Sequence, residues 1–183
     1  MKILMVIAKT GFQDVEYQIP FEYFTSVGYE VDVASSELGT CEGKLGMEVE
    51  ADLSFKDAHM GDYRAIVLIG GPGSVDLIGN EELEDLLIKA RDLDLTIGAI
   101  CHAPVILAHA FITRDLNSTV WNGDGLQEQE LEKFGVKFVD QDVVIDDNVV
   151  TANGPDAAKR FAEEVLNNIE LKQEDEDFDG DFE

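Results

Sequence analysis

The sequence predicts an α/β sandwich with a mainly parallel sheet. Three short runs, Ile3–Ala8, Ala65–Ile69 and Thr96–Ile100, are continuously apolar, as is typical of strands that helices cover on both faces. Amphipathic helical patterns lie between these runs, and strands that alternate with helices at this spacing are typical of parallel sheets. With 183 residues, 45% of them apolar, the chain can form one domain with a single substantial core.

The remaining elements follow from local patterns. The first crossover helix is expected over Val15–Val27, with Pro20 a few residues into it, and Tyr29–Ala34 follows as a strand. Glu81–Arg91 predicts a second helix, because acidic side chains in its first turn interact favourably with the helix dipole. A last helix is expected from Pro155 to about residue 169.

Two segments depart from this alternation and predict antiparallel hairpins. Gly39–Phe55 carries three glycines among short extended runs. Val143–Thr151 places Asp147 and Asn148 between two apolar halves, which is a strong signal for a hairpin turn. The first hairpin is either an interface element or surface decoration.

The net charge of -26 excludes some partners. A field of this sign repels nucleic acid and anionic membrane surfaces, so we expect neither as a partner. The charge fits either a halophilic source, where salt screens the repulsion, or an ordinary acidic protein. Seven of the 39 acidic residues fall in the last ten positions. We therefore expect a folded domain over residues 1–170 and a disordered acidic tail over residues 171–183.

The N-terminal apolar run is too short for a signal peptide, and no run approaches the roughly 18 residues that a membrane span requires. The two cysteines, Cys41 and Cys101, form no disulfide framework or CxxC metal pair. We expect a soluble, cytoplasmic protein.

The segment Thr96–Leu107 reads as a buried strand that stops at Cys101 and turns straight into a helix. A helix N-terminus favours the thiolate, which is the reactive form of cysteine. Ala99 and Ala103 leave room for such a tight turn, as the small residues around the serine of many hydrolases do. The alternative is a buried structural cysteine.

Further candidates follow the other two strands, because parallel strands end at one edge of the sheet. Gly70 and Gly71 allow close backbone approach, so their N–H groups, with that of His102, can hold an oxyanion. Glu16 either hydrogen-bonds the sulfur and moves its proton or is a surface acid at a helix start. No metal-ligand spacing and no nucleotide-binding glycine motif is present, so we expect neither a metal nor a cofactor.

Taken together, these motifs resemble the DJ-1/PfpI superfamily, and its PfpI-like branch of intracellular protease/amidase-like proteins in particular. The resemblance extends over residues 1 to about 168 and rests on Phe12–Glu16 with Pro20, on Gly70-Gly71 and on Ala99–Pro104. It implies a flavodoxin-like three-layer sandwich of the class I glutamine amidotransferase-like type, with a strand–Cys–helix nucleophile elbow. It also implies a homodimer or higher homo-oligomer.

The resemblance assigns roles residue by residue. Cys101 matches the family nucleophile, Glu16 the sulfur-facing glutamate and His102 the histidine beside the cysteine. Gly70 and Gly71 match the glycines of the oxyanion loop. Trp121 stands where relatives have a tyrosine or histidine near the thiol, and it either narrows the pocket or packs.

Two positions depart from the family pattern. Peptidase members complete their site with a glutamate from a neighbouring subunit, and Val75 occupies that position, with Asp76 next to it. Gln13 replaces an acidic residue. Without an acid the imidazole of His102 lacks an orienting partner, which weakens the peptidase interpretation.

Three functions remain open. The first is a cysteine-dependent stress-type enzyme that acts on small reactive carbonyls, as glyoxalases and deglycases do, without a cofactor. The second is a peptidase or amidase that uses Cys101 and His102. The third is a non-enzymatic redox sensor or chaperone-like stress protein in which Cys101 oxidises to a sulfinic acid.

Overall fold

The computed structural model describes residues 1–180, and the side chains of residues 1–172. It confirms the expected fold class, a mixed α/β sandwich around a mainly parallel sheet. Seven strands form this sheet in the order β11-β12-β8-β7-β1-β3-β6, and all neighbours are parallel except β11 and β12. The strands are β1 (Lys2–Val6), β3 (Glu30–Ser35), β6 (Leu53–Ser54), β7 (Ala65–Leu68), β8 (Thr96–Ile100), β11 (Val143–Asp146) and β12 (Val149–Ala152).

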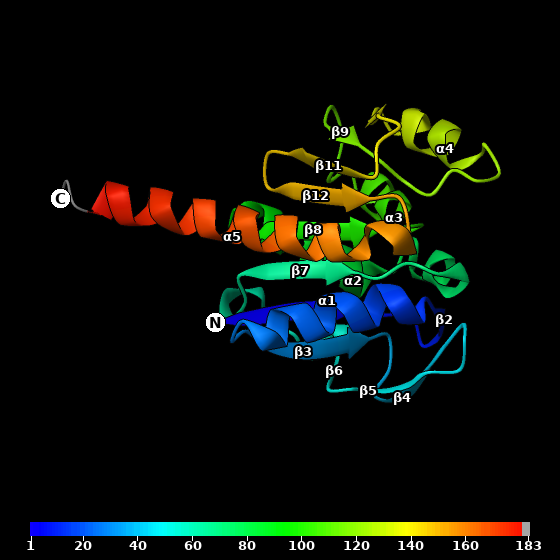
Figure 1. Cartoon of the computed structure of the whole chain (residues 1–183), viewed down its shortest axis with the longest axis horizontal. Coiled ribbons are helices and arrows are strands. Elements are labelled where there is room, and N and C mark those ends of the chain that lie inside the picture. Colours follow the sequence, from blue (N-terminus) through cyan, green and yellow to red (C-terminus); the bar gives the residue numbers. More distant parts are fainter. Residues whose placement is uncertain (181–183) are drawn as a thin grey trace.

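Helices cover both faces of this sheet (Figure 1). On one face, α1 (Asp14–Ser26) packs against α5 (Ala158–Gly180), and α5 also contacts β8 and β12. On the other face lie α2 (Glu81–Asp92) and α3 (Pro104–His109), with α4 (Gln127–Lys133) beyond α3. Burial on both faces explains the continuous apolar runs: Ile3 and Met5 of β1 join one core cluster, and Leu4 joins the other.

Both predicted hairpins form. β4 (Gly39–Gly43) pairs antiparallel with β5 (Glu48–Ala51), and β2 (Thr10–Phe12) adds a parallel third strand. β11 and β12 pair antiparallel around Asp147, whose φ of 54° is one that a tight two-residue turn requires. A further two-stranded sheet joins β9 (Asn117–Ser118) and β10 (Lys137–Phe138).

Short 3-10 turns link several elements: residues Phe55–Asp57, Met60–Asp62, Pro72–Leu77 and Pro155–Ala157. The last of these turns begins the predicted C-terminal helix, which then continues as α5. The acidic tail predicted from residue 171 begins within α5. Its side chains beyond Lys172 and its last three residues lie outside the described part, so its predicted disorder stays a prediction.

The strand order reverses between β1 and β7. From β1 the chain continues to β3, which pairs with one edge of β1, and it later returns to β7, which pairs with the opposite edge of β1. Such a reversal opens a crevice at the carboxyl ends of the strands. The arrowheads of β3, β7, β8 and β12 point to the same side of the molecule (Figure 1), and β1 runs parallel to β3 and β7. Within residues 1–180, no helix combines the length and apolar character needed to cross a membrane.

Candidate active site

Cys101 lies at a sharp turn directly after β8. Its φ of 62° is unusual for a residue with a side chain, and the surrounding hydrogen bonds hold it there. Its N–H donates to the carbonyl of Ala152 at 2.8 Å, and its carbonyl accepts from the N–H of Trp121 at 2.9 Å. The helix that follows begins only at Pro104 and has six residues. The strand, the turn at Cys101 and the helix therefore follow one another as predicted, and residues 101–103 form the turn.

Gly70 brings the thiol and Glu16 together. A methyl group added at Gly70 would lie 2.5 Å from Cβ of Cys101 and 2.8 Å from Oε2 of Glu16. Real side chains do not approach this closely, so the contact requires glycine. Gly71 next to it has a φ of 106° and packs against the backbone of the loop that follows β1. The N–H groups of Gly71 and His102 interact with the sulfur of Cys101.

Glu16 is fully buried in the first turn of α1, with an exposed fraction of 0%. Gln13 fixes this turn, because its side-chain oxygen accepts hydrogen bonds from the N–H groups of Val15 and Glu16. Neither carboxyl oxygen of Glu16 has a partner in full hydrogen-bond geometry within the described residues. Burial raises the pKa of Glu16 to about 7, although the Cys101 thiol and the N–H of Gly70 lower it in part.

The resting form of Cys101 is the thiol. Burial and, to a smaller extent, the charge of Glu16 raise the pKa of Cys101 to about 12, against the lowering effect of the N–H groups of Gly71 and His102. The expectation that the helix N-terminus favours a thiolate is therefore wrong for the resting site. The physical reason is burial, since the side chain is only 7% exposed, together with the neighbouring charge of Glu16. A neighbouring base must remove the proton when the sulfur reacts.

His102 is only half-buried and its Nδ1 has no hydrogen-bond partner among residues 1–172. Burial lowers its pKa, and the carbonyl of Gly71 and the charge of Asp124 oppose this effect. Its ring packs edge-to-face on Trp121, with centroids 4.7 Å apart. Val75 and Asp76 are both exposed, and neither forms a hydrogen bond to the imidazole. Within the described part of this chain, no acid completes a Cys-His-acid set.

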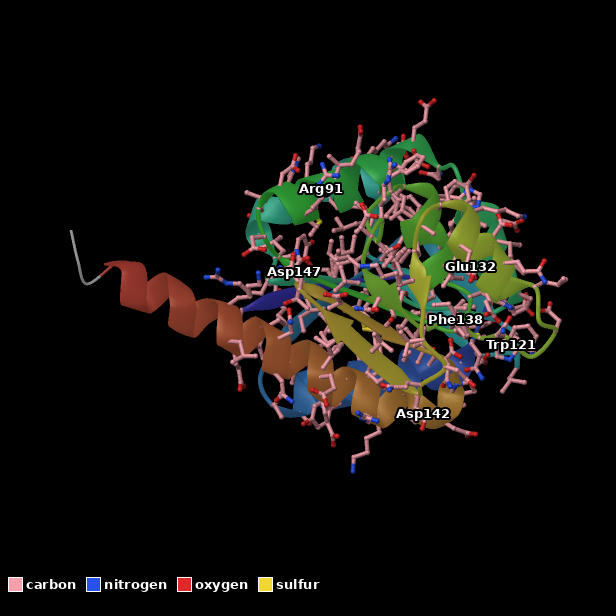
Figure 2. All side chains as sticks on the ribbon, turned by 90° about the horizontal axis from the view of Figure 1, so that it is seen from above. Arg91, Trp121, Glu132, Phe138, Asp142 and Asp147 are labelled. Atoms are coloured by element: carbon pink, nitrogen blue, oxygen red, sulfur yellow. The ribbon has the colours of Figure 1, made fainter. Side chains whose placement is uncertain are left out.

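Trp121 both packs and narrows the pocket above the thiol. Figure 2 shows it at the end of the molecule opposite the far end of α5. The pocket has a volume of about 270 Å³, and its lining includes every predicted site residue except Gly70, which lies beneath Cys101. It is lined by Gln13, Glu16, Lys44, Gly71, Pro72, Cys101, His102, Trp121 and Pro155.

Lys44 is the lining residue that the sequence interpretation missed. It lies in the turn between β4 and β5, and only the pairing of that hairpin with β2 brings it to the pocket. The local sequence Gly43-Lys44 does not by itself predict that this lysine lines a pocket. Among the described residues, no cluster of three or more His, Cys, Asp and Glu side chains is arranged to hold a metal ion.

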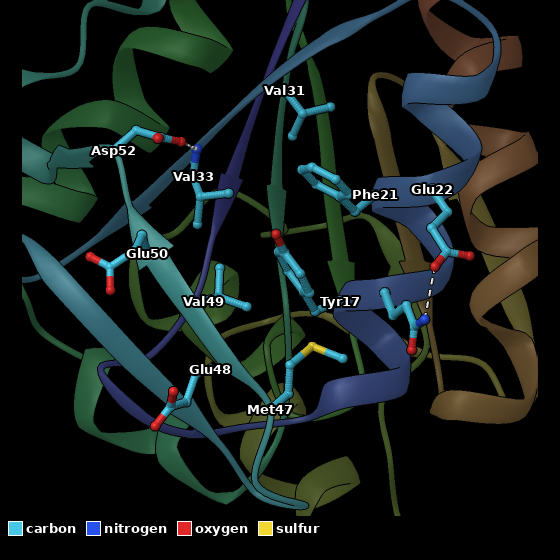
Figure 3. Close-up of a pocket in the computed structure, with 11 residues that line it drawn as sticks. Tyr17, Phe21, Glu22, Val31, Val33, Met47, Glu48, Val49, Glu50 and Asp52 are labelled. Carbon is cyan, nitrogen blue, oxygen red and sulfur yellow. Dashed lines mark hydrogen bonds between the residues drawn. The ribbon is translucent and has the colours of Figure 1, made fainter.

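A larger groove of about 550 Å³ lies elsewhere, between α1, β3 and β5 (Figure 3). Tyr17, Phe21 and Val49 form its apolar floor, and Glu22, Glu48 and Glu50 lie along it. It contains no cysteine, histidine or lysine.

Similar proteins were found by sequence and by structure. A protein described as uncharacterized from Methanocaldococcus jannaschii is 40% identical over 94% of this chain and 84% of its own. Deglycases from Pyrococcus horikoshii and Pyrococcus furiosus are 34% and 32% identical, each over 85% of this chain and 91% of their own. The crystal structure of a ThiJ/PfpI domain protein from Brachyspira murdochii superposes with a TM-score of 0.88 and 32% identity, covering 93% and 96% of the two chains.

The profile of the DJ-1/PfpI family matches residues 1–168, which span the whole sheet and the candidate site. The resemblance inferred from the motifs is thereby confirmed, and the chain belongs to the DJ-1/PfpI family.

Proposed function

We propose that this protein converts small reactive carbonyl compounds, such as methylglyoxal and glyoxal, to hydroxy acids through Cys101, with Glu16 as the proton carrier. The observation that carries the proposal is a buried thiol beside a buried carboxyl group whose pKa is about 7. At neutral pH such a carboxyl is present both as acid and as base, which suits repeated proton transfer. Relatives named deglycases support the same class of chemistry.

The first step forms a hemithioacetal. Glu16 takes the proton of the Cys101 thiol as the sulfur attacks the aldehyde carbon, and the same proton then passes to the carbonyl oxygen. The N–H groups of Gly71 and His102 flank the sulfur, so they are placed to stabilise the charge that develops on this oxygen.

The second step is an internal rearrangement followed by hydrolysis. Glu16 removes the proton from the former aldehyde carbon and returns it to the neighbouring carbon. The hydroxyl proton of the adduct passes to the oxygen of that neighbouring carbon, which gives a thioester of a hydroxy acid. Water then cleaves the carbon–sulfur bond and releases the hydroxy acid and the free thiol. One carbonyl compound and one water together give one hydroxy acid, so the reaction needs no oxidant or reductant.

The peptidase alternative fits these side chains less well. It needs an acid to orient His102, and none contacts the imidazole within the described residues. An acid from a second copy of the chain would have to supply it. Loss of activity on dissociation of an oligomer would then distinguish a peptidase from the carbonyl enzyme.

The direct test is hydroxy-acid formation from methylglyoxal and glyoxal by the wild type, Cys101→Ala and the matched control Cys41→Ala. We expect the wild type and Cys41→Ala to form lactate and glycolate, and Cys101→Ala to lose at least about 100-fold in rate. Equal rates for the wild type and Cys101→Ala would overturn the proposal. Assays at low and high salt would also test the halophilic interpretation.

A further inference from the structure

Lys44 places a positive charge at the Cys101 pocket. It is the lining residue that is a cation at neutral pH, since burial lowers the pKa of His102. Within residues 1–172, no carboxylate forms an ion pair or a hydrogen bond with its ammonium group.

The turn that carries Lys44 is held rigidly against the start of α1. The carboxylate of Asp14, which is only 5% exposed, accepts hydrogen bonds from the N–H groups of Leu45 and Met47, both at 2.8 Å. The N–H of Lys44 donates to the carbonyl of Phe12 at 2.7 Å. A side chain at Gly43 would lie 2.6 Å from Asp14, so glycine is needed to admit the carboxylate.

This attachment fixes the backbone of Lys44 while its side chain stays exposed at the pocket. Figure 1 shows the β4–β5 turn beside β2, on the side to which the parallel strands point. The charge of Lys44 reaches the reacting groups, because it lowers the pKa of both Glu16 and His102. A lysine whose backbone is fixed at the pocket and whose ammonium group has no carboxylate partner within residues 1–172 is suited to bind an anionic group of a ligand.

We propose that Lys44 makes the pocket favour carbonyl reactants that carry a carboxylate over neutral ones such as methylglyoxal, because its ammonium group binds the carboxylate while Cys101 attacks the reacting carbon. The choice of carbonyl substrates rests on the proposed function, whereas the preference for a negative charge does not. Asp14 is then a positioning residue, since it acts only through the turn.

Two alkylating reagents test the charge preference without any turnover. Iodoacetate and iodoacetamide are nearly equal in size and both form a thioether with the Cys101 sulfur by displacing iodide, but only iodoacetate is anionic. Both require the same thiolate, so the ratio of their rates cancels any effect of a substitution on the pKa of Cys101. The rates are followed by the mass of the peptide that contains Cys101.

The variants are Lys44→Gln, Lys44→Arg and the matched control Lys56→Gln, which removes an exposed lysine from a different pocket. We expect Lys44→Gln to lower the iodoacetate-to-iodoacetamide ratio by about 3- to 10-fold. Lys44→Arg restores most of the ratio, and Lys56→Gln leaves it unchanged. Asp14→Asn lowers the ratio as well if the turn loses its attachment.

An unchanged ratio in Lys44→Gln would overturn the inference, as would an equal fall in Lys56→Gln, which would indicate net charge alone. Failure of the proposed function has a different signature. In that case methylglyoxal and glyoxal give no Cys101-dependent hydroxy acid, while the alkylation ratio still reports whether Lys44 selects anions.

Discussion

The two cysteines of this chain are both buried, yet their surroundings differ completely. Cys41 lies inside β4 with an exposed fraction of 0%, and its thiol faces only the carbonyl of Gly39, at 3.6 Å. Cys101 lies at a turn with a positive φ, 7% exposed, beside a buried acid and under a pocket. Judged by residue type and burial alone, both would be interpreted as buried structural cysteines.

The difference lies in the turn and its neighbours, and the proposed reactivity of Cys101 rests on them. At Cys101 the strand ends, so the sulfur meets backbone N–H groups and the carboxyl of Glu16 instead of packed side chains. Burial keeps Cys101 as the thiol and raises the pKa of Glu16 to about 7, so a proton can pass between the two groups during the reaction. Cys41 has no such proton acceptor among the groups that its thiol contacts.

The largest effect is expected at the glycine that lets the two groups meet. Gly70→Ala places a methyl group 2.5 Å from Cβ of Cys101 and from the carbonyl of Ile100, so the turn must shift. We expect hydroxy-acid formation to fall about 100-fold, since small displacements of reacting groups cost about this much. Gly61→Ala is the matched control, because no atom lies within 4 Å of the added methyl group. Wild-type activity in Gly70→Ala would contradict the described contact.

A smaller effect is expected in stability. Because the pKa of Glu16 is higher in the folded protein than the ordinary value of 4.5, its contribution is fully present below pH 4.5 and is lost as the pH rises through about 7. The rise corresponds to roughly 3 kcal/mol. Glu16→Gln removes this dependence. The wild type should therefore lose stability between pH 4.5 and pH 8, whereas the free energy of unfolding of the variant should not show this loss. Urea unfolding at several pH values measures this, and a constant difference would mean that Glu16 is not held neutral.

Much of this site could be predicted from the sequence. The apolar runs that end at Ala8, Ile69 and Ile100 placed three loops at one edge of the sheet, and the structure brings Glu16, Gly70 and Cys101 together there. These elements have strong local signals, because buried parallel strands need continuous apolar residues.

The rest depends on how distant segments pack. The raised pKa of Cys101 follows from burial and from Glu16, and neither effect can be read from the strand–turn pattern. Lys44 is an exposed residue in a turn, and it reaches the pocket only because Asp14, far away in sequence, binds that turn. No local pattern encodes such a contact.

The central claim is that Glu16 takes the proton of the Cys101 thiol, and the pH dependence of kcat/KM for methylglyoxal tests it most directly. Only the carboxylate form can accept a proton, so the wild-type value should rise about tenfold per pH unit below pH 7 and level off above it. Glu16→Gln should be at least about 100-fold slower and should lack this rise. A Glu16→Gln variant that keeps the wild-type rate and profile would contradict the claim and transfer the role of base to another group.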